Sequence, residues 1–109
     1  MLKEDIIKSL SITGKQQKKL EDYIKALSDY NTHTNLVGRS TLTNPWQDHI
    51  LDSLQILPFI KNKKLSILDM GTGAGLPGLA LNIMDCENVS VVDSSGKKIF
   101  FLKKVKKEL

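Results

Sequence analysis

Apolar residues in the first half of the chain recur every three or four positions, a spacing that predicts amphipathic helices. The clearest stripe runs from residue 15 to about residue 30 and leaves the opposite face polar. A shorter stripe within residues 1–13 predicts a preceding helix. We therefore expect the N-terminal part of the chain to be helical.

A third helix is expected from Asn44 to about Leu57. Asn44 is a suitable N-cap, Pro45 fits the first helical position, and Pro58 ends the helix. Apolar residues on one face of this helix are Trp46, Ile50, Leu54 and Leu57.

His49 lies in the third helix, with Asp52 and Ser53 three and four positions further along. A hydrolase triad is not expected, because all three groups come from one short helical segment with neither a strained nucleophile turn nor a recognisable oxyanion hole. The spacing instead predicts a histidine that Asp52 orients, for packing or for lining a ligand site. No residue is assigned as a catalytic acid or base.

Two short apolar runs follow, residues 65–68 and 89–92, and each is followed by an acid, Asp69 or Asp93. Such runs are typical of buried strands in a parallel sheet. The 18 residues of segment 71–88 are enough for the helical crossover that parallel strands require.

The order of these elements predicts an α/β protein. Residues 1–60 form the helical segment, and residues 61–109 form the βαβα start of a Rossmann-like sheet, with Ser94 or Ser95 capping the last helix. Two strands make a marginal sheet, and a doubly wound fold completes its ligand crevice with neighbouring strands. We therefore expect the chain to be the N-terminal part of a longer domain.

A glycine-rich loop connects the first strand to the crossover helix. Glycine allows sharp turns and lets a ligand approach the main chain closely. Gly73, Gly75 and Gly78 satisfy the G-x-G-x-x-G fingerprint of dinucleotide sites. Asp69, two residues before the first glycine of the loop, instead favours a ligand that carries an ammonium or sulfonium group. Asp93 suits ribose hydroxyls in either class of ligand.

Composition indicates one small globular domain, since 109 residues with 40% apolar and 26% charged residues fit neither a disordered nor a fibrous chain. No apolar run approaches the length of a membrane span, and the N-terminus lacks a signal-peptide pattern. A cytoplasmic protein is the simplest expectation. Cys86 is the only cysteine, which excludes an internal disulfide and a multi-cysteine zinc site; no metal is expected.

Positive charge is concentrated at the C-terminal end. Residues 94–109 carry a net charge of +5, whereas the rest of the chain sums to −1. This basic helix either faces phosphate or is simply solvated. Its first lysines, Lys97 and Lys98, are candidate RNA contacts together with Arg39, the only arginine, whose planar guanidinium suits a phosphate or a carboxylate.

Three segments, residues 49–54, 68–78 and 93–102, resemble in their order and spacing the glucose-inhibited division protein B family. The match extends to an asparagine-leucine step at Asn35 and Leu36. The chain departs from the family at Asp48, where a basic residue is usual, so no anion contact is carried over to that position.

This resemblance implies a Rossmann-like methyltransferase that uses S-adenosylmethionine to modify a guanine N7 of small-subunit (16S) ribosomal RNA, and a monomer is favoured. Guanine N7 already presents a lone pair, so the reaction requires no general base. The resemblance also implies that Gly71 and Leu76 line the cofactor, that Asp69, Gly73 and Gly75 shape the loop, and that Asp93 lies near the ribose.

Two other function classes remain open. A fragment of a nicotinamide-dependent oxidoreductase would account for the glycine spacing and would bind NADH but not S-adenosylmethionine. A non-catalytic RNA-binding module would use the lysines of the last helix. Its RNA binding would depend on salt and would be insensitive to Asp69→Ala and to cofactor.

Overall fold

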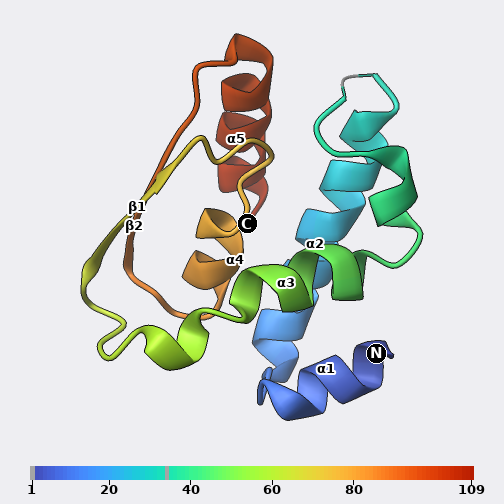
Figure 1. Ribbon diagram of the computed structural model, residues 1–109. Coiled ribbons are helices and arrows are strands. Elements are labelled where there is room, and N and C mark those ends of the chain that lie inside the picture. Colours follow the sequence, from blue (N-terminus) through green and yellow to red (C-terminus); the bar gives the residue numbers. More distant parts are fainter. Residues whose placement is uncertain (1, 34) are drawn as a thin grey trace.

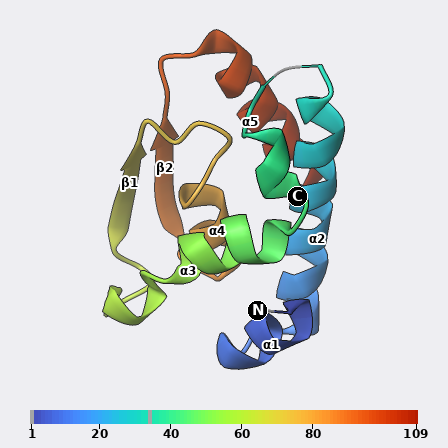
Figure 2. The ribbon, with the colours of Figure 1, turned by 45° about the vertical axis from the view of Figure 1, so that its right-hand side comes forward.

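The computed structural model describes residues 2–33 and 35–109; Met1 and Thr34, which belong to the first predicted helix and to the loop before Arg39, lie outside the described residues. In Figures 1 and 2 all helices lie on one side of a two-stranded sheet, with α4 and α5 next to it and α2 beyond them. The predicted α/β class and order of elements are confirmed. The elements are α1 (Lys3–Ser9), α2 (Gly14–Asn31), a 3₁₀ turn (Arg39–Leu42), a π-helical segment (Trp46–Leu51), α3 (Asp52–Leu54), a second 3₁₀ turn (Leu57–Phe59), β1 (Ser66–Met70), α4 (Gly78–Ile83), β2 (Asn88–Val92) and α5 (Gly96–Glu108).

Helix α2 is the central helix of the core, as its apolar stripe predicts. It begins with a capping box, in which the Thr13 hydroxyl accepts from the Gln16 amide and the Gln16 side chain accepts from the Thr13 amide. Gln16 also donates to the Asp85 carboxylate at 2.9 Å, which ties the start of α2 to the turn after α4. The fully buried side chains of α2 are Leu20, Tyr23 and Leu27.

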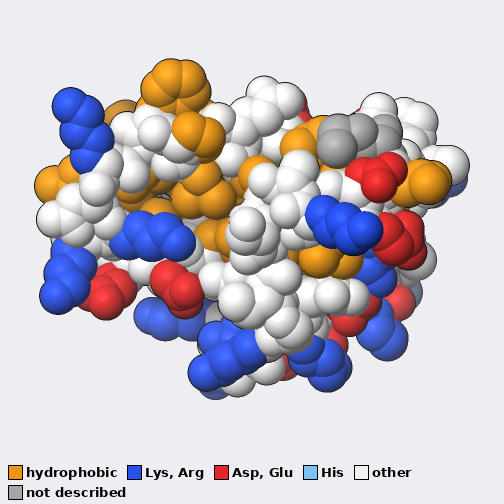
Figure 3. Space-filling model, turned by 90° about the horizontal axis from the view of Figure 1, so that it is seen from below, with side chains coloured by type: hydrophobic (Ala, Val, Ile, Leu, Met, Phe, Trp, Pro, Cys, Tyr) orange, Lys and Arg blue, Asp and Glu red, His pale blue; other side chains and the backbone are white. Residues whose placement is uncertain are grey.

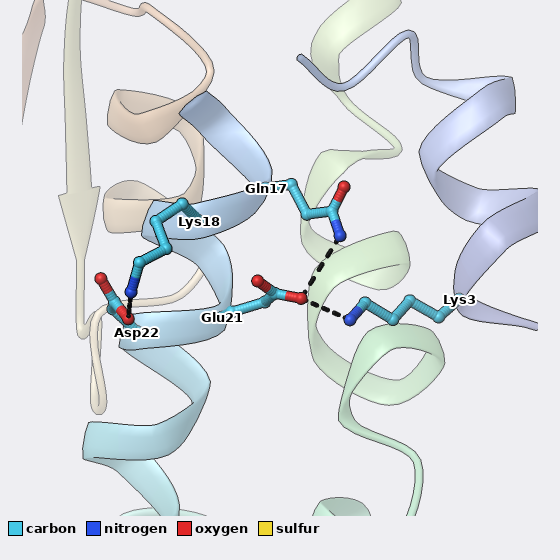
Figure 4. Close-up of polar contacts among 5 residues, drawn as sticks. All are labelled: Lys3, Gln17, Lys18, Glu21 and Asp22. Atoms are coloured by element: carbon cyan, nitrogen blue, oxygen red, sulfur yellow. Dashed lines mark hydrogen bonds and ion pairs between the residues drawn. The ribbon is translucent and has the colours of Figure 1, made fainter. Parts of the chain in front are cut away.

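Polar contacts join α1 to α2 along their solvent side (Figure 4). The Lys3 ammonium pairs with the Glu21 carboxylate, which also accepts from the Gln17 side chain. These contacts, Lys3 first, lower the pKa of Glu21. Lys18 and Asp22 form an ion pair within α2 at 2.7 Å. Exposed pairs of this kind contribute little to stability, so the core residues of α2 dominate its packing.

The predicted continuous α-helix after Asn44 is wrong in its geometry, although its start is confirmed. The Asn44 side chain accepts from the Gln47 amide at 3.4 Å, and a π-helical segment, Trp46–Leu51, then leads into α3. Trp46, Ile50 and Leu54 are all buried and lie four residues apart. Side chains four residues apart also share one face of an α-helix, so the apolar pattern by itself does not distinguish a π turn from an α-helical turn.

Strands β1 and β2 pair in parallel, with Ser66 opposite Asn88 and Met70 opposite Val92. The expectation of fully buried strands is wrong for one face. Side chains that point toward α4 and α5 are half-buried, whereas Met70 on the other face is 76% exposed. In Figure 3 hydrophobic side chains gather on the side of the molecule where the sheet lies. The cause is that the helices of the described chain all lie on one side of the sheet (Figures 1 and 2), with α4 packed directly on it.

Helix α5 begins where predicted. The Ser95 hydroxyl accepts from the Lys98 amide at 3.4 Å, which identifies Ser95 as the cap. The inward face of α5 buries Phe101, Leu102 and Val105. Within the described part of the chain, no helix has both the length and the apolar character needed to cross a membrane.

Candidate functional site

The glycine-rich loop connects the carboxyl end of β1 to the start of α4, and its glycines have two different roles. Gly71, Gly73 and Gly75 all have positive φ, of 67°, 60° and 102°. A Cβ at Gly71 would meet no atom within 4 Å, whereas a Cβ at Gly75 would lie 2.5 Å from Leu79 and 2.8 Å from Leu102. Gly71 therefore leaves space that a ligand can enter, while Gly75 lets the loop pack against two helices.

Asp69 closes this loop at its base. Its Oδ2 atom accepts a 2.6 Å hydrogen bond from the Thr72 hydroxyl and a 2.9 Å bond from the amide of Gly78, the first residue of α4. A Cβ on Gly78 would lie 2.6 Å from Val91, so the start of α4 packs directly on β2. Asp69 thus places a negative charge at the N-terminus of the crossover helix.

Asp93 contacts the same loop from the end of β2. Its Oδ2 atom accepts from the Gly73 amide at 2.7 Å, and its Oδ1 atom accepts from the Ser95 amide at 2.8 Å. These two amides, Ser95 first, and the nearby charge of Lys98 lower the pKa of the carboxyl group. Asp93 is therefore ionised at neutral pH. A carboxylate has about four acceptor positions, so capacity for ligand hydroxyls remains.

Leu76 lies at the far end of the loop and is half-buried. Its amide donates to the Thr72 carbonyl at 3.2 Å, and the Gly75 amide donates to the same carbonyl at 3.0 Å. The buried Thr72 amide in turn donates to the Val92 carbonyl of β2 at 2.9 Å. The main chain of the loop is therefore fixed to the second strand at Thr72.

A buried tyrosine fixes the other side of the loop. The Tyr23 hydroxyl donates to the Ala74 carbonyl at 2.7 Å. Burial raises the pKa of this hydroxyl far above its usual range, so it remains a donor. In the sequence, Tyr23 is only one member of the apolar stripe predicted for residues 15 to about 30. A buried tyrosine hydroxyl needs a hydrogen-bond partner, so a tyrosine within an apolar stripe is the signal that such a partner exists.

The prediction that Asp52 orients His49 is wrong. The His49 Nε2 atom lies 2.8 Å from the Thr41 hydroxyl, while Asp52 is exposed to solvent. Burial lowers the pKa of His49, and the charges of Asp48 and Asp52 oppose this change. The contact joins the π-helical segment to the 3₁₀ turn that begins at Arg39, so His49 has a positioning role.

The three basic residues singled out in the sequence come together in space. Arg39, Lys97 and Lys98 line one surface cavity of about 410 Å³ between the end of α2 and the start of α5. A Cβ on Gly73 would lie 4.0 Å from the Lys98 ammonium, so this cavity adjoins the glycine-rich loop. Ser95 also lines the cavity and follows Asp93 at the end of β2.

Fold and site together define an α/β domain with a parallel sheet, and in open sheets of this kind ligands bind at the carboxyl ends of the strands. A sequence model of the GidB family, described as rRNA small subunit methyltransferase G, matches residues 16–109, and the chain belongs to this family. This confirms the resemblance found in the sequence.

Individual relatives carry the same description. The ribosomal RNA small subunit methyltransferase G of Rickettsia rickettsii (strain Sheila Smith) is 43% identical over 90 residues, which cover 83% of this chain and 47% of that protein. The corresponding protein of Orientia tsutsugamushi (strain Ikeda) is 44% identical over 87 residues, covering 80% of this chain and 44% of its own length. The chain spans about half the length of the curated relatives it matches.

Proposed function

We propose that this chain provides the cofactor-binding part of an S-adenosylmethionine-dependent methyltransferase that modifies a guanine N7 of small-subunit ribosomal RNA. The observation that carries the proposal, together with the family membership, is the hydrogen bond between Asp69 and the Gly78 amide. In dinucleotide-binding domains a pyrophosphate occupies the N-terminus of this helix. Here a carboxylate already holds that position and would repel a phosphate.

The carboxylate acceptors beside the loop fit a cationic ligand that carries a ribose. Asp69 and Asp93 both carry carboxylates at this edge of the sheet, and the Gly73 amide donates to Asp93. The open space at Gly71 leaves room for the ligand beside the main chain. These features favour S-adenosylmethionine over NADH, although the glycine spacing alone fits both.

The residues of this chain would bind and orient, because the reaction needs little acid–base chemistry. S-adenosylmethionine supplies a methyl group on a positively charged sulfur, and guanine N7 offers a lone pair without first losing a proton. Catalysis then depends on holding the two reactants in line. The loop would contribute by fixing the cofactor between Asp69 and Asp93. An unpaired guanine is the expected target, because side chains cannot read the narrow major groove of an RNA helix.

Methyl transfer to unmodified small-subunit ribosomal RNA tests the proposal. The chain is incubated with labelled S-adenosylmethionine and the RNA, and the nucleosides released by nuclease are analysed by mass spectrometry. We expect labelled 7-methylguanosine, and less of it with Asp69→Asn. Label confined to another nucleoside, or binding of NADH without S-adenosylmethionine, would contradict the proposal.

A further inference from the structure

We propose that Arg39, Lys97 and Lys98 form a binding site for a backbone phosphate of RNA, directly beside the cofactor loop. The inference rests on the proposed function for the identity of the nucleic acid. The three side chains come from two segments far apart in the sequence, and Figure 2 shows the segment after α2 beside the start of α5. The remaining residues that line the cavity are polar: Asn31, Thr32, His33, Asn35 and Ser95.

The charges of this cavity are available to a ligand. Elsewhere on the surface Lys3, Lys18 and Lys25 are each paired with a carboxylate of α2. Within residues 2–33 and 35–109, none of the three cations of the cavity forms such an ion pair, and no acidic residue lines the cavity. The site therefore concentrates positive charge in a concave, polar surface.

Buried contacts hold the segment that carries Arg39. The Asn31 side chain is buried at the end of α2, and its Oδ1 atom accepts from the amides of Leu36 and Val37 at 2.7 and 3.1 Å. On the far side of Arg39, the Thr41 hydroxyl contacts His49. The guanidinium therefore extends from a turn that is fixed on both sides.

Hydrogen bonds also hold the opposite wall of the cavity, which is the start of α5. Asp93 accepts from the Ser95 amide, and Ser95 caps the helix that carries Lys97 and Lys98. A planar guanidinium with two ammonium groups is a donor set that suits phosphate oxygens. The cavity opens to solvent, as a phosphodiester within a longer strand requires. Because Lys98 also lies near Gly73 and Asp93, a phosphate bound here would lie directly beside the glycine-rich loop.

RNA binding in the absence of cofactor tests this site. We would titrate a fluorescein-labelled single-stranded RNA of mixed sequence with the chain and follow anisotropy over a series of KCl concentrations. Arg39→Gln and Lys98→Gln are each expected to weaken binding about tenfold, the loss of one charged hydrogen bond. Each should also reduce the slope of log K against log salt by roughly 0.7. Lys98→Arg should retain most of the affinity.

Lys15→Gln is the matched control, because Lys15 is exposed at the start of α2, away from the cavity, and its replacement removes the same charge. The proposal is overturned if Lys15→Gln weakens binding as much as Arg39→Gln, or if the wild-type chain does not bind the RNA at low salt. Calorimetric titration of the same variants with S-adenosylmethionine separates the two proposals. If the chain binds S-adenosylmethionine but the cavity variants bind RNA as tightly as Lys15→Gln does, only the phosphate site is contradicted. If the cavity variants lose RNA affinity but the chain does not bind S-adenosylmethionine, only the proposed function is contradicted.

Discussion

The Tyr23 hydroxyl and the Ala74 carbonyl are 51 positions apart in the sequence and share a 2.7 Å hydrogen bond in the buried core. This bond joins the central helix α2 to the middle of the glycine-rich loop. Asp69 holds the base of the same loop through the Thr72 hydroxyl, and Asp93 holds Gly73. The loop is thus fixed from the helical part of the chain as well as from the sheet, and its shape depends on both.

Tyr23→Phe should destabilise the chain by about 1 to 3 kcal/mol, because it leaves a buried carbonyl without its donor. Urea unfolding followed by circular dichroism measures this change, and calorimetry should show weaker S-adenosylmethionine binding. Tyr30→Phe is the control, since the Tyr30 ring keeps its contact with Phe101. Equal stability of the wild-type and Tyr23→Phe proteins would show that the bond does not fix the loop.

Gly75→Ala should cost about 2 to 4 kcal/mol of unfolding free energy, because the new methyl group meets Leu79 and Leu102 and the residue has a φ of 102°. Gly96→Ala provides the comparison. A Cβ at Gly96 meets no atom within 4 Å, and alanine there should be neutral or stabilising by up to about 1 kcal/mol. Similar unfolding midpoints for the two variants would contradict the assigned packing role of Gly75.

His49 makes stability depend on pH. Burial lowers its pKa below the usual 6.5, so the folded protein binds fewer protons at this site than the unfolded chain. The free energy of unfolding should therefore fall as the pH is lowered through about 6.5 toward the pKa of the folded state. Urea unfolding at a series of pH values measures the effect, and His49→Gln should remove this part of it. An identical pH profile for the variant would rule the explanation out.

Local patterns in the sequence were enough to predict most of the elements. Helix α2 follows from the spacing of its apolar residues. The cap at Ser95 follows from a side chain that can accept a hydrogen bond from an amide in the first turn of its own helix. The acids at the ends of β1 and β2 could also be placed together, since parallel strands bring their carboxyl ends to one edge of a sheet. The glycines at 71, 73 and 75 were expected to turn the chain, and all three have positive φ.

Contacts between distant segments could not be predicted in this way. Nothing local to Tyr23 or Ala74 indicates that they meet, and the cavity that joins Arg39 to Lys98 depends on how Asn31 folds the chain after α2. The π-helical segment was missed because the spacing of Trp46, Ile50 and Leu54 is also that of an α-helical stripe. The uncovered face of the sheet was missed because the sequence does not show that all helices pack on one side.

Asp69→Asn provides the most direct test of the account. The amide oxygen of asparagine can accept from both Thr72 and Gly78, so the variant removes the charge while keeping these hydrogen bonds. Calorimetric titration of the wild-type chain with S-adenosylmethionine should show saturable binding, with no binding of NADH. Binding should be weakened at least about tenfold in Asp69→Asn, the equivalent of about 1.4 kcal/mol.

Circular dichroism spectra and urea midpoints of the two proteins establish that both are folded during the titration. Equal affinity of the two proteins for S-adenosylmethionine would contradict a role for the Asp69 charge. A folded wild-type chain that binds NADH but not S-adenosylmethionine would contradict the account as a whole.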